Sequence, residues 1–188
     1  MRHVFRWAFV CLVLGAGRAE AGPWSITLYG GPATHTIFTD FLAGRYTWDS
    51  GMIALAADRR IAHVGWGIDL VAEGQVQQFD FGHSYTSLAL GIGGEFHGFP
   101  WENRVPTTVS IFAGPTYSFG PPQIYPSDEF GSRKSLLNYV SIEVAVALPQ
   151  TRHWDAVFRI YHRSGMWGIY TLDPDEVTVV GGGIRLRL

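Results

Sequence analysis

The sequence predicts an all-β protein, an eight-stranded antiparallel transmembrane β-barrel formed by residues 22–188. Three observations predict this fold: a short apolar export segment at the start, an aromatic-rich chain without an apolar stretch long enough for a membrane helix, and a series of eight strand-like segments. In lipid every backbone polar group needs a partner within the protein, which only helices and closed barrels provide. Without a candidate helix, the barrel is the remaining way to span a membrane.

The first 21 residues have the layout of a secretory signal peptide. Arg2 and Arg6 precede an apolar run over residues 7–14, and Ala19 and Ala21 form a small-residue exit. The run is too short to cross a bilayer, so we expect cleavage after Ala21 and residence in the outer membrane of a Gram-negative bacterium. The single cysteine, Cys11, lies in this segment, and the mature chain is therefore expected to fold without disulfides.

The composition of the remaining chain is unusual for a water-soluble domain. Charged residues make up only 16% of the sequence, while aromatic residues reach 14%. No stretch after residue 21 approaches the roughly 18 to 20 consecutive apolar residues of a membrane helix. There is also no basic patch with interleaved aromatics, which argues against a nucleic-acid partner.

Eight segments have the composition and alternation of strands. The connections after the second, fourth and sixth segments are short (residues 58–60, 97–104 and 149–152). The connections after the first, third, fifth and seventh segments are each about ten residues or longer. Short periplasmic turns alternating with long external loops are typical of outer-membrane barrels, and eight strands leave an interior that side chains fill. The predicted strands are 24–32, 47–57, 61–72, 84–96, 105–119, 136–148, 153–164 and 176–188.

Alternation along segment 153–164 places its polar residues on opposite faces. His162 and Ser164 fall on the apolar, lipid-facing side, while Arg159 and Arg163 point into the barrel. By the same parity Glu176, at the start of the last strand, also faces outward. The chain direction brings these three outward residues together near the outer-leaflet boundary, where an ionisable side chain is costly.

The combination of His162, Ser164 and Glu176 is typical of a hydrolytic site. A serine hydroxyl becomes a nucleophile when a base takes its proton, and a third group usually orients that base. The backbones of His162 and Ser164 are about 6–7 Å apart by the strand rise, so their side chains can meet. This predicts ester hydrolysis through an acyl-enzyme on Ser164, with His162 as base, Glu176 as its orienting acid, and no cofactor or metal ion. The oxyanion donors are expected among the backbone N–H groups of residues 165–168.

The last strand pair, with HRSG at 162–165, Glu176 and the ending GGGIRLRL, resembles the lipid A 3-O-deacylase (PagL) family of outer-membrane acyl hydrolases. The resemblance implies an eight-stranded barrel with a lipid-facing Ser–His–Glu triad and lipid A (lipopolysaccharide) of the outer leaflet as substrate. Two positions depart from the family pattern. Gly165 follows the serine where well-known members carry Asn, and Leu188 ends the chain where Phe is common.

Two other functions fit the same pattern. The chain could be a non-catalytic barrel, an adhesin or a membrane-stabilising protein, or an outer-membrane phospholipase acting on esters at a similar depth. The pattern leaves open which acyl chain is cut and whether the barrel forms a homodimer. The remaining polar strand residues are expected to form a paired interior, without a spacing that predicts a metal site. They are His63, Asp69, Glu95, Glu143, Asp155, Arg159, Arg185 and Arg187.

Overall fold

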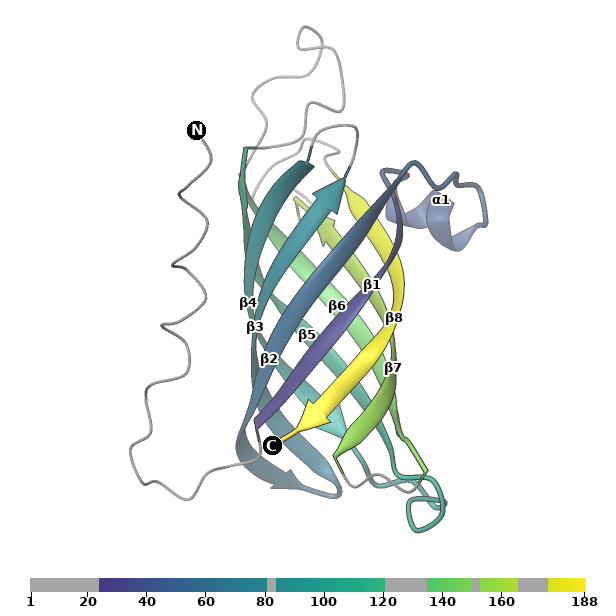
Figure 1. Cartoon of the computed structure of the whole chain (residues 1–188), viewed down its shortest axis with the longest axis vertical. Helices are drawn as coiled ribbons and strands as arrows, with labels where there is room; N and C mark the ends of the chain where they lie inside the picture. The colour runs from purple at the N-terminus through teal and green to yellow at the C-terminus, as the bar shows by residue number, and fades with distance from the viewer. Residues whose placement is uncertain (1–23, 81–83, 121–134, 150–152, 166–175) are drawn as a thin grey trace, which may run out of the picture.

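The chain folds into a closed antiparallel barrel in which each strand pairs with its neighbours in sequence and β1 pairs with β8 (Figure 1). The structure is a computed structural model and describes residues 24–80, 84–120, 135–149, 153–165 and 176–188, so the predicted signal peptide lies outside the described residues. The predicted fold class is confirmed. The elements are β1 (Trp24–Thr34), α1 (Phe38–Leu42), β2 (Ser50–Gly65), β3 (Ile68–Asp80), β4 (Ser84–Phe96), β5 (Thr107–Phe119), β6 (Leu136–Ala147), β7 (Trp154–Ser164) and β8 (Val177–Arg187).

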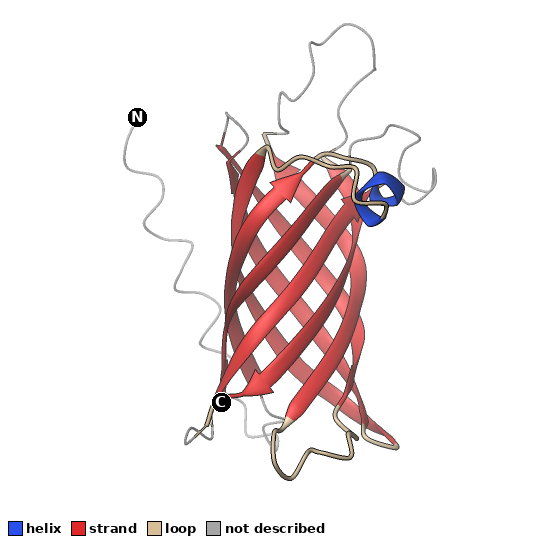
Figure 2. Ribbon diagram, turned by 90° about the vertical axis from the view of Figure 1, so that its right-hand side faces the viewer, coloured by secondary structure: helices blue, strands red, loops and turns tan. Residues whose placement is uncertain are grey.

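The two ends of the barrel differ. Strand β1 starts and β8 finishes at the end that also carries the β2–β3 turn, and we call this the turn end (Figures 1 and 2). The short helix α1 lies outside the barrel wall at the opposite end, which we call the loop end. Among the described residues, no helix has the length and apolar character needed to cross a membrane.

Six strands match their predicted limits to within two residues, but the predicted turn at residues 58–60 is wrong. Strand β2 continues through these residues to Gly65, and the chain reverses at Trp66 and Gly67, both of which have positive φ (56° and 74°). Two consecutive positive-φ residues form the tight hairpin turn whose twist matches that of the flanking strands. The polar residues that suggested a turn instead have partners on β1: Asp58 accepts a hydrogen bond from Ser25, and Arg59 lies over the Trp24 ring.

The expected contrast between short turns and long loops is also wrong in one place. The connection after the third strand was expected to be long, yet β3 extends to Asp80 and leaves only residues 81–83 before β4. The chain at 73–80 is polar, which suggested a loop. In the barrel its odd-numbered residues are buried inside, and the Gln75 side chain is hydrogen-bonded to both Glu73 and Gln77.

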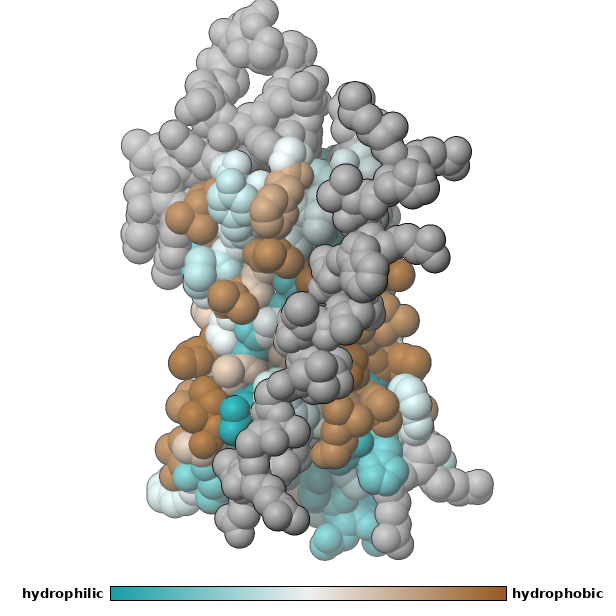
Figure 3. Space-filling model, turned by 60° about the vertical axis from the view of Figure 1, so that its left-hand side comes forward, coloured by the Kyte–Doolittle hydropathy of each residue, from teal (hydrophilic) through white to brown (hydrophobic). Residues whose placement is uncertain are grey.

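The outer surface is apolar, and the interior is polar. Aliphatic and aromatic side chains are exposed along the strands and gather over the barrel wall (Figure 3). This is the arrangement of a membrane barrel, in which lipid rather than a protein core covers the apolar face. The exposed residues include Ile26, Leu28, Ile53, Val76, Leu88, Leu90, Ile92, Ile111, Ile142, Phe158 and Ile184.

Arg159 lies at the centre of the interior and is fully buried. Its guanidinium contacts Glu73 and Glu143 at 2.6 Å each and lies 4.7 Å from the centre of the Tyr29 ring. Glu143 also pairs with Arg185. The predicted paired interior is confirmed for Glu143, Arg159 and Arg185, and Glu73 is a further member that the sequence did not indicate. Because each buried charge has a partner, the network meets the condition under which charges are tolerated away from water.

The glycines of β4 make room for this interior. A Cβ atom at Gly91 would collide with the Tyr139 hydroxyl, which donates a hydrogen bond to Glu73 at 2.9 Å. The glycine at position 91 is therefore explained by the close approach of an inward tyrosine, and a Cβ atom at Gly93 would likewise collide with the Phe112 ring.

Candidate active site

His162 and Ser164 lie on the outer face of β7, as predicted. Burial alternates along the strand: odd-numbered residues, among them Arg159 and Arg163, are buried inside, and even-numbered residues face outward. Ser164 is the last residue of the strand and pairs with Asn138 of β6, and His162 is two residues earlier on the same face. Both are half-buried, at the loop end of the barrel.

Glu176 immediately precedes β8, the strand paired with β7. Its Oε2 lies 4.0 Å from His162 Nε2, and the two side chains are 25% and 14% exposed, respectively. The sequence therefore correctly predicted that the acid and the imidazole come together. The distance is too long for a hydrogen bond, so the carboxylate can act on the ring through its charge once the imidazole is protonated.

The imidazole has a hydrogen-bond partner that the sequence analysis missed. His162 Nδ1 lies 3.0 Å from Thr178 Oγ1, on the directly opposed residue of β8. Thr178 in turn opposes Thr34 of β1, so these three residues form one row across the outer face of three strands. Parity on β8 indicated that Thr178 faces outward, but only the register shows that it opposes His162.

The β1–β2 connection covers this row from outside. The Phe38 ring lies 4.5 Å from the His162 ring, centre to centre, and the Phe38 backbone N–H donates a 2.8 Å hydrogen bond to Glu176 Oε2. These contacts explain why Thr34 and Thr178 are fully buried although they face away from the barrel interior. The predicted strands leave residues 33–46 as a loop, and no pattern in that stretch indicates that Phe38, the first residue of α1, contacts the site.

Further aromatic residues extend from Phe38 along the same connection. Phe41, Tyr46 and Trp48 contact one another, with ring centres 4.8–6.3 Å apart, and Tyr46 and Trp48 are exposed. Aromatic side chains of this kind are favoured at the boundary between lipid and water. The site is thus bordered by a surface suited to the headgroup region of a membrane.

The arrangement can support base catalysis by His162. If the Thr178 oxygen accepts the Nδ1–H, Nε2 carries the free lone pair that can take a proton. The Glu176 carboxylate then lies where it stabilises the imidazolium that forms. Ser164 and Gly165 follow His162 by two and three residues in the chain. Most of the predicted oxyanion donors, those in residues 166–168, lie outside the described residues.

The apolar belt, the charged interior and the closed eight-stranded topology define the class: this is a small outer-membrane β-barrel. No protein-family model and no curated protein matches the chain in sequence. Solved structures match it in fold. The crystal structure of the outer membrane enzyme PagL is similar over 87% of this chain and 99% of that chain, with 12% identity and a TM-score of 0.58.

A bacterial surface protein and a designed barrel match about equally well. Neisserial surface protein A is similar over 89% of this chain and 99% of its own, with 11% identity and a TM-score of 0.55. A designed transmembrane β-barrel covers 90% of this chain and 98% of its own, with 10% identity and the same TM-score of 0.55. At such identities the similarity concerns the fold alone, so any activity has to be argued from the side chains.

Proposed function

We propose that this protein is an outer-membrane esterase that removes an ester-linked acyl chain from lipid A, with Ser164 as nucleophile and His162 as base. The observation that carries the proposal is the outward-facing group of His162, Ser164 and Glu176 at the loop end of the barrel. A soluble substrate could not use a site on the lipid-facing wall. An acyl chain of the surrounding leaflet is already beside it.

The chemistry follows the two steps of a serine hydrolase. The Ser164 hydroxyl adds to the ester carbonyl while its proton passes to His162 Nε2, and the sugar alkoxide leaves with that proton to give an acyl-serine. Water then adds to the acyl-serine and loses a proton to His162; the bond between the acyl carbon and the Ser164 oxygen breaks as His162 returns that proton to the serine, and the free fatty acid departs. Glu176 stabilises the positively charged ring in both steps, and the mechanism requires no metal ion.

A division of roles between Thr178 and Glu176 follows from the distances. Thr178 is within hydrogen-bond distance of the ring and fixes its tautomer, while Glu176 supplies charge. Phe38 holds Glu176 through its backbone N–H and packs on the ring. Phe38 and Thr178 are thus positioning residues for His162.

The direct test combines an assay with covalent labelling. Purified, folded protein is incubated with lipid A, and mass spectrometry is expected to show the loss of one hydroxyacyl mass. A long-chain fluorophosphonate, which reacts with activated serines, is expected to label the peptide that contains Ser164. If folded protein leaves lipid A unaltered but releases fatty acid from phospholipids, the phospholipase alternative is correct. If it acts on neither, the chain is a non-catalytic barrel.

Replacing Thr178 by valine should slow lipid A deacylation about fivefold, because a single hydrogen bond to the imidazole contributes roughly 1 kcal/mol. Valine preserves the size of the side chain, so the buried row keeps its packing. The measurement is the initial rate at saturating lipid A. Thr86→Val is the matched control, since Thr86 lies on β4 and hydrogen-bonds Gln78 instead. An unchanged rate in Thr178→Val would contradict the orienting role.

A further inference from the structure

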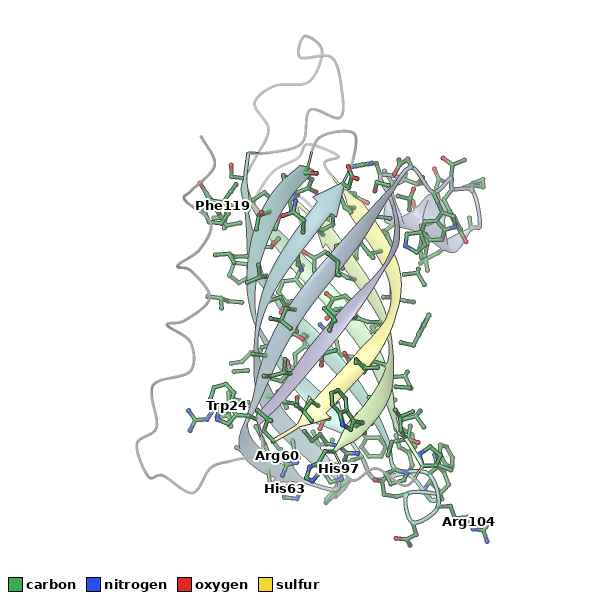
Figure 4. The ribbon with its side chains drawn as sticks, in the orientation of Figure 1. Trp24, Arg60, His63, His97, Arg104 and Phe119 are labelled. Carbon is green, nitrogen blue, oxygen red and sulfur yellow. The ribbon has the colours of Figure 1, made fainter. Side chains whose placement is uncertain are left out.

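A second group of ionisable residues lies at the turn end, far from the candidate active site. It consists of His63, near the end of β2, Asp69 of β3, and His97, directly after β4. Figure 4 shows His63 and His97 beside Arg60 at the end of the barrel opposite α1. The proposed esterase chemistry uses none of these residues.

The strand register aims all three side chains toward one point. Asp69 faces inward and is 1% exposed, and His63 is its direct partner across the β2–β3 ladder. On the other side Asp69 opposes Glu95 of β4, and His97 is two residues further along the same face.

A β-bulge is responsible for the position of His63. Arg60 opposes Val71, but Ala62 opposes Leu70, so Ile61 is an extra residue in β2. The extra residue exchanges the two faces of the strand. Without it His63 would point outward, whereas with it His63 points inward, next to Asp69. Bulges often re-aim a side chain in this way near functional sites.

The turns hold His97 close to this pair. The His97 N–H donates a 2.8 Å hydrogen bond to the Gly67 carbonyl, and a Cβ atom at Gly67 would lie 2.9 Å from the Gly98 Cα. The β2–β3 turn and the start of the β4–β5 connection are therefore in direct backbone contact. Because Gly67 also has a positive φ of 74°, this approach depends on glycine.

The side-chain distances suit a cation. His63 Nδ1 lies 2.7 Å from Asp69 Oδ1, His97 Nε2 lies 3.5 Å from Asp69 Oδ2, and the three candidate ligand atoms all lie within 4.8 Å of one another. A tetrahedral ion binds such atoms at about 2.0–2.2 Å, which places the ligand atoms roughly 3.5 Å apart. Small side-chain rotations are enough to reach this geometry.

From this geometry we infer that His63, Asp69 and His97 bind a divalent first-row transition metal ion, with Zn²⁺ as the best-matched probe. Two imidazoles and one carboxylate are ligands that zinc prefers, and they leave a fourth position for water. Arg60 Nε lies 2.6 Å from Asp69 Oδ2 and acts as the outer partner that orients the carboxylate, leaving Oδ1 for the metal. The His63 and His97 side chains, 58% and 36% exposed, give the ion access from the aqueous side.

Such an ion would connect β2, β3 and the β4–β5 connection at one end of the barrel. The mature chain has no cysteine for a disulfide under the predicted cleavage, and metal coordination would add a link between side chains of these segments beyond the Arg60–Asp69 ion pair. The ion would act on stability rather than on ester hydrolysis.

The test uses the full mature barrel, produced without a histidine tag, folded in detergent and treated with a chelator. Calorimetric titration with Zn²⁺ should show one site per chain, and Zn²⁺ should raise the thermal midpoint of unfolding. Co²⁺ should give the visible absorption bands of a four-coordinate site. His63→Ala and His97→Ala should each weaken Zn²⁺ binding at least tenfold and abolish the Co²⁺ bands. Both residues are partly exposed, so these variants are expected to fold.

His153→Ala is the matched control, because His153 is an exposed histidine that contacts the Arg187 carbonyl. It should bind Zn²⁺ like the wild type, as should Ser164→Ala, which separates this inference from the proposed esterase. If the double variant His63→Ala/His97→Ala binds Zn²⁺ as tightly as the wild type, the site is disproved. If the wild type binds no Zn²⁺, the three residues form only a hydrogen-bonded cluster.

Discussion

Replacing Ser164 by alanine is expected to lower the rate of lipid A deacylation by about 10⁴- to 10⁶-fold, the range seen when a serine hydrolase loses its nucleophile. The hydroxyl forms the covalent bond to the acyl group, so no neighbouring residue can replace it. Ser164 is half-buried at the end of β7 and faces away from the charged interior. The variant should therefore fold, and the loss should appear in the rate alone. The measurement is the release of hydroxyacyl chains, followed by mass spectrometry.

Ser84→Ala is the matched control for this experiment. Ser84 is an exposed serine at the first position of β4, also at the loop end of the barrel, but distant in the strand order from β7. Its removal should leave the rate unchanged. Full activity in Ser164→Ala would contradict the proposed mechanism, while wild-type activity that disappears in both variants would indicate a general effect on folding.

Replacing Arg159 by methionine is expected to destabilise the barrel by about 3–5 kcal/mol. Methionine has a similar length but no charge, so Glu73 and Glu143 would lose a shared partner while remaining fully buried. The contact of the guanidinium with the Tyr29 ring would be lost as well. Urea-induced unfolding of the barrel in lipid vesicles measures the change in the free energy of unfolding.

Two variants show whether burial is the cause. Arg45→Met removes a cation from an ion pair with Asp40 whose side chains are 74% and 36% exposed, and it should change stability by less than about 1 kcal/mol. Adding Glu73→Gln and Glu143→Gln to Arg159→Met should restore part of the lost stability, because the repelling carboxylates are then neutral. If Arg159→Met is as stable as the wild type, the interior does not depend on this cation.

The architecture could be predicted from the sequence because a membrane barrel requires lipid-facing and inward-facing residues to alternate along each strand. Each strand alternates between lipid and interior, so Phe158 and Ile160 on one face and Arg159 and Arg163 on the other identify β7 without any tertiary information. The same alternation predicted that His162 and Ser164 share the outer face. The turn between β2 and β3 was misplaced because charged residues occur in turns and also in the interior of a small barrel, where Asp58 is buried and Arg60 pairs with Asp69.

The fold class, the facing of the β7 residues and the neighbouring positions of His162 and Glu176 could be predicted from the sequence, because they follow from the two-residue period of a strand and from the pairing of adjacent strands. Which side chains are in contact could be learned only from the three-dimensional structure. The strand register sets Thr178 opposite His162. The β1–β2 connection folds back so that Phe38 contacts both His162 and Glu176. An extra residue in β2 directs His63 toward Asp69. Such contacts join segments far apart in the chain, and their geometry depends on register shifts of one residue, which leave no periodic signal in the sequence.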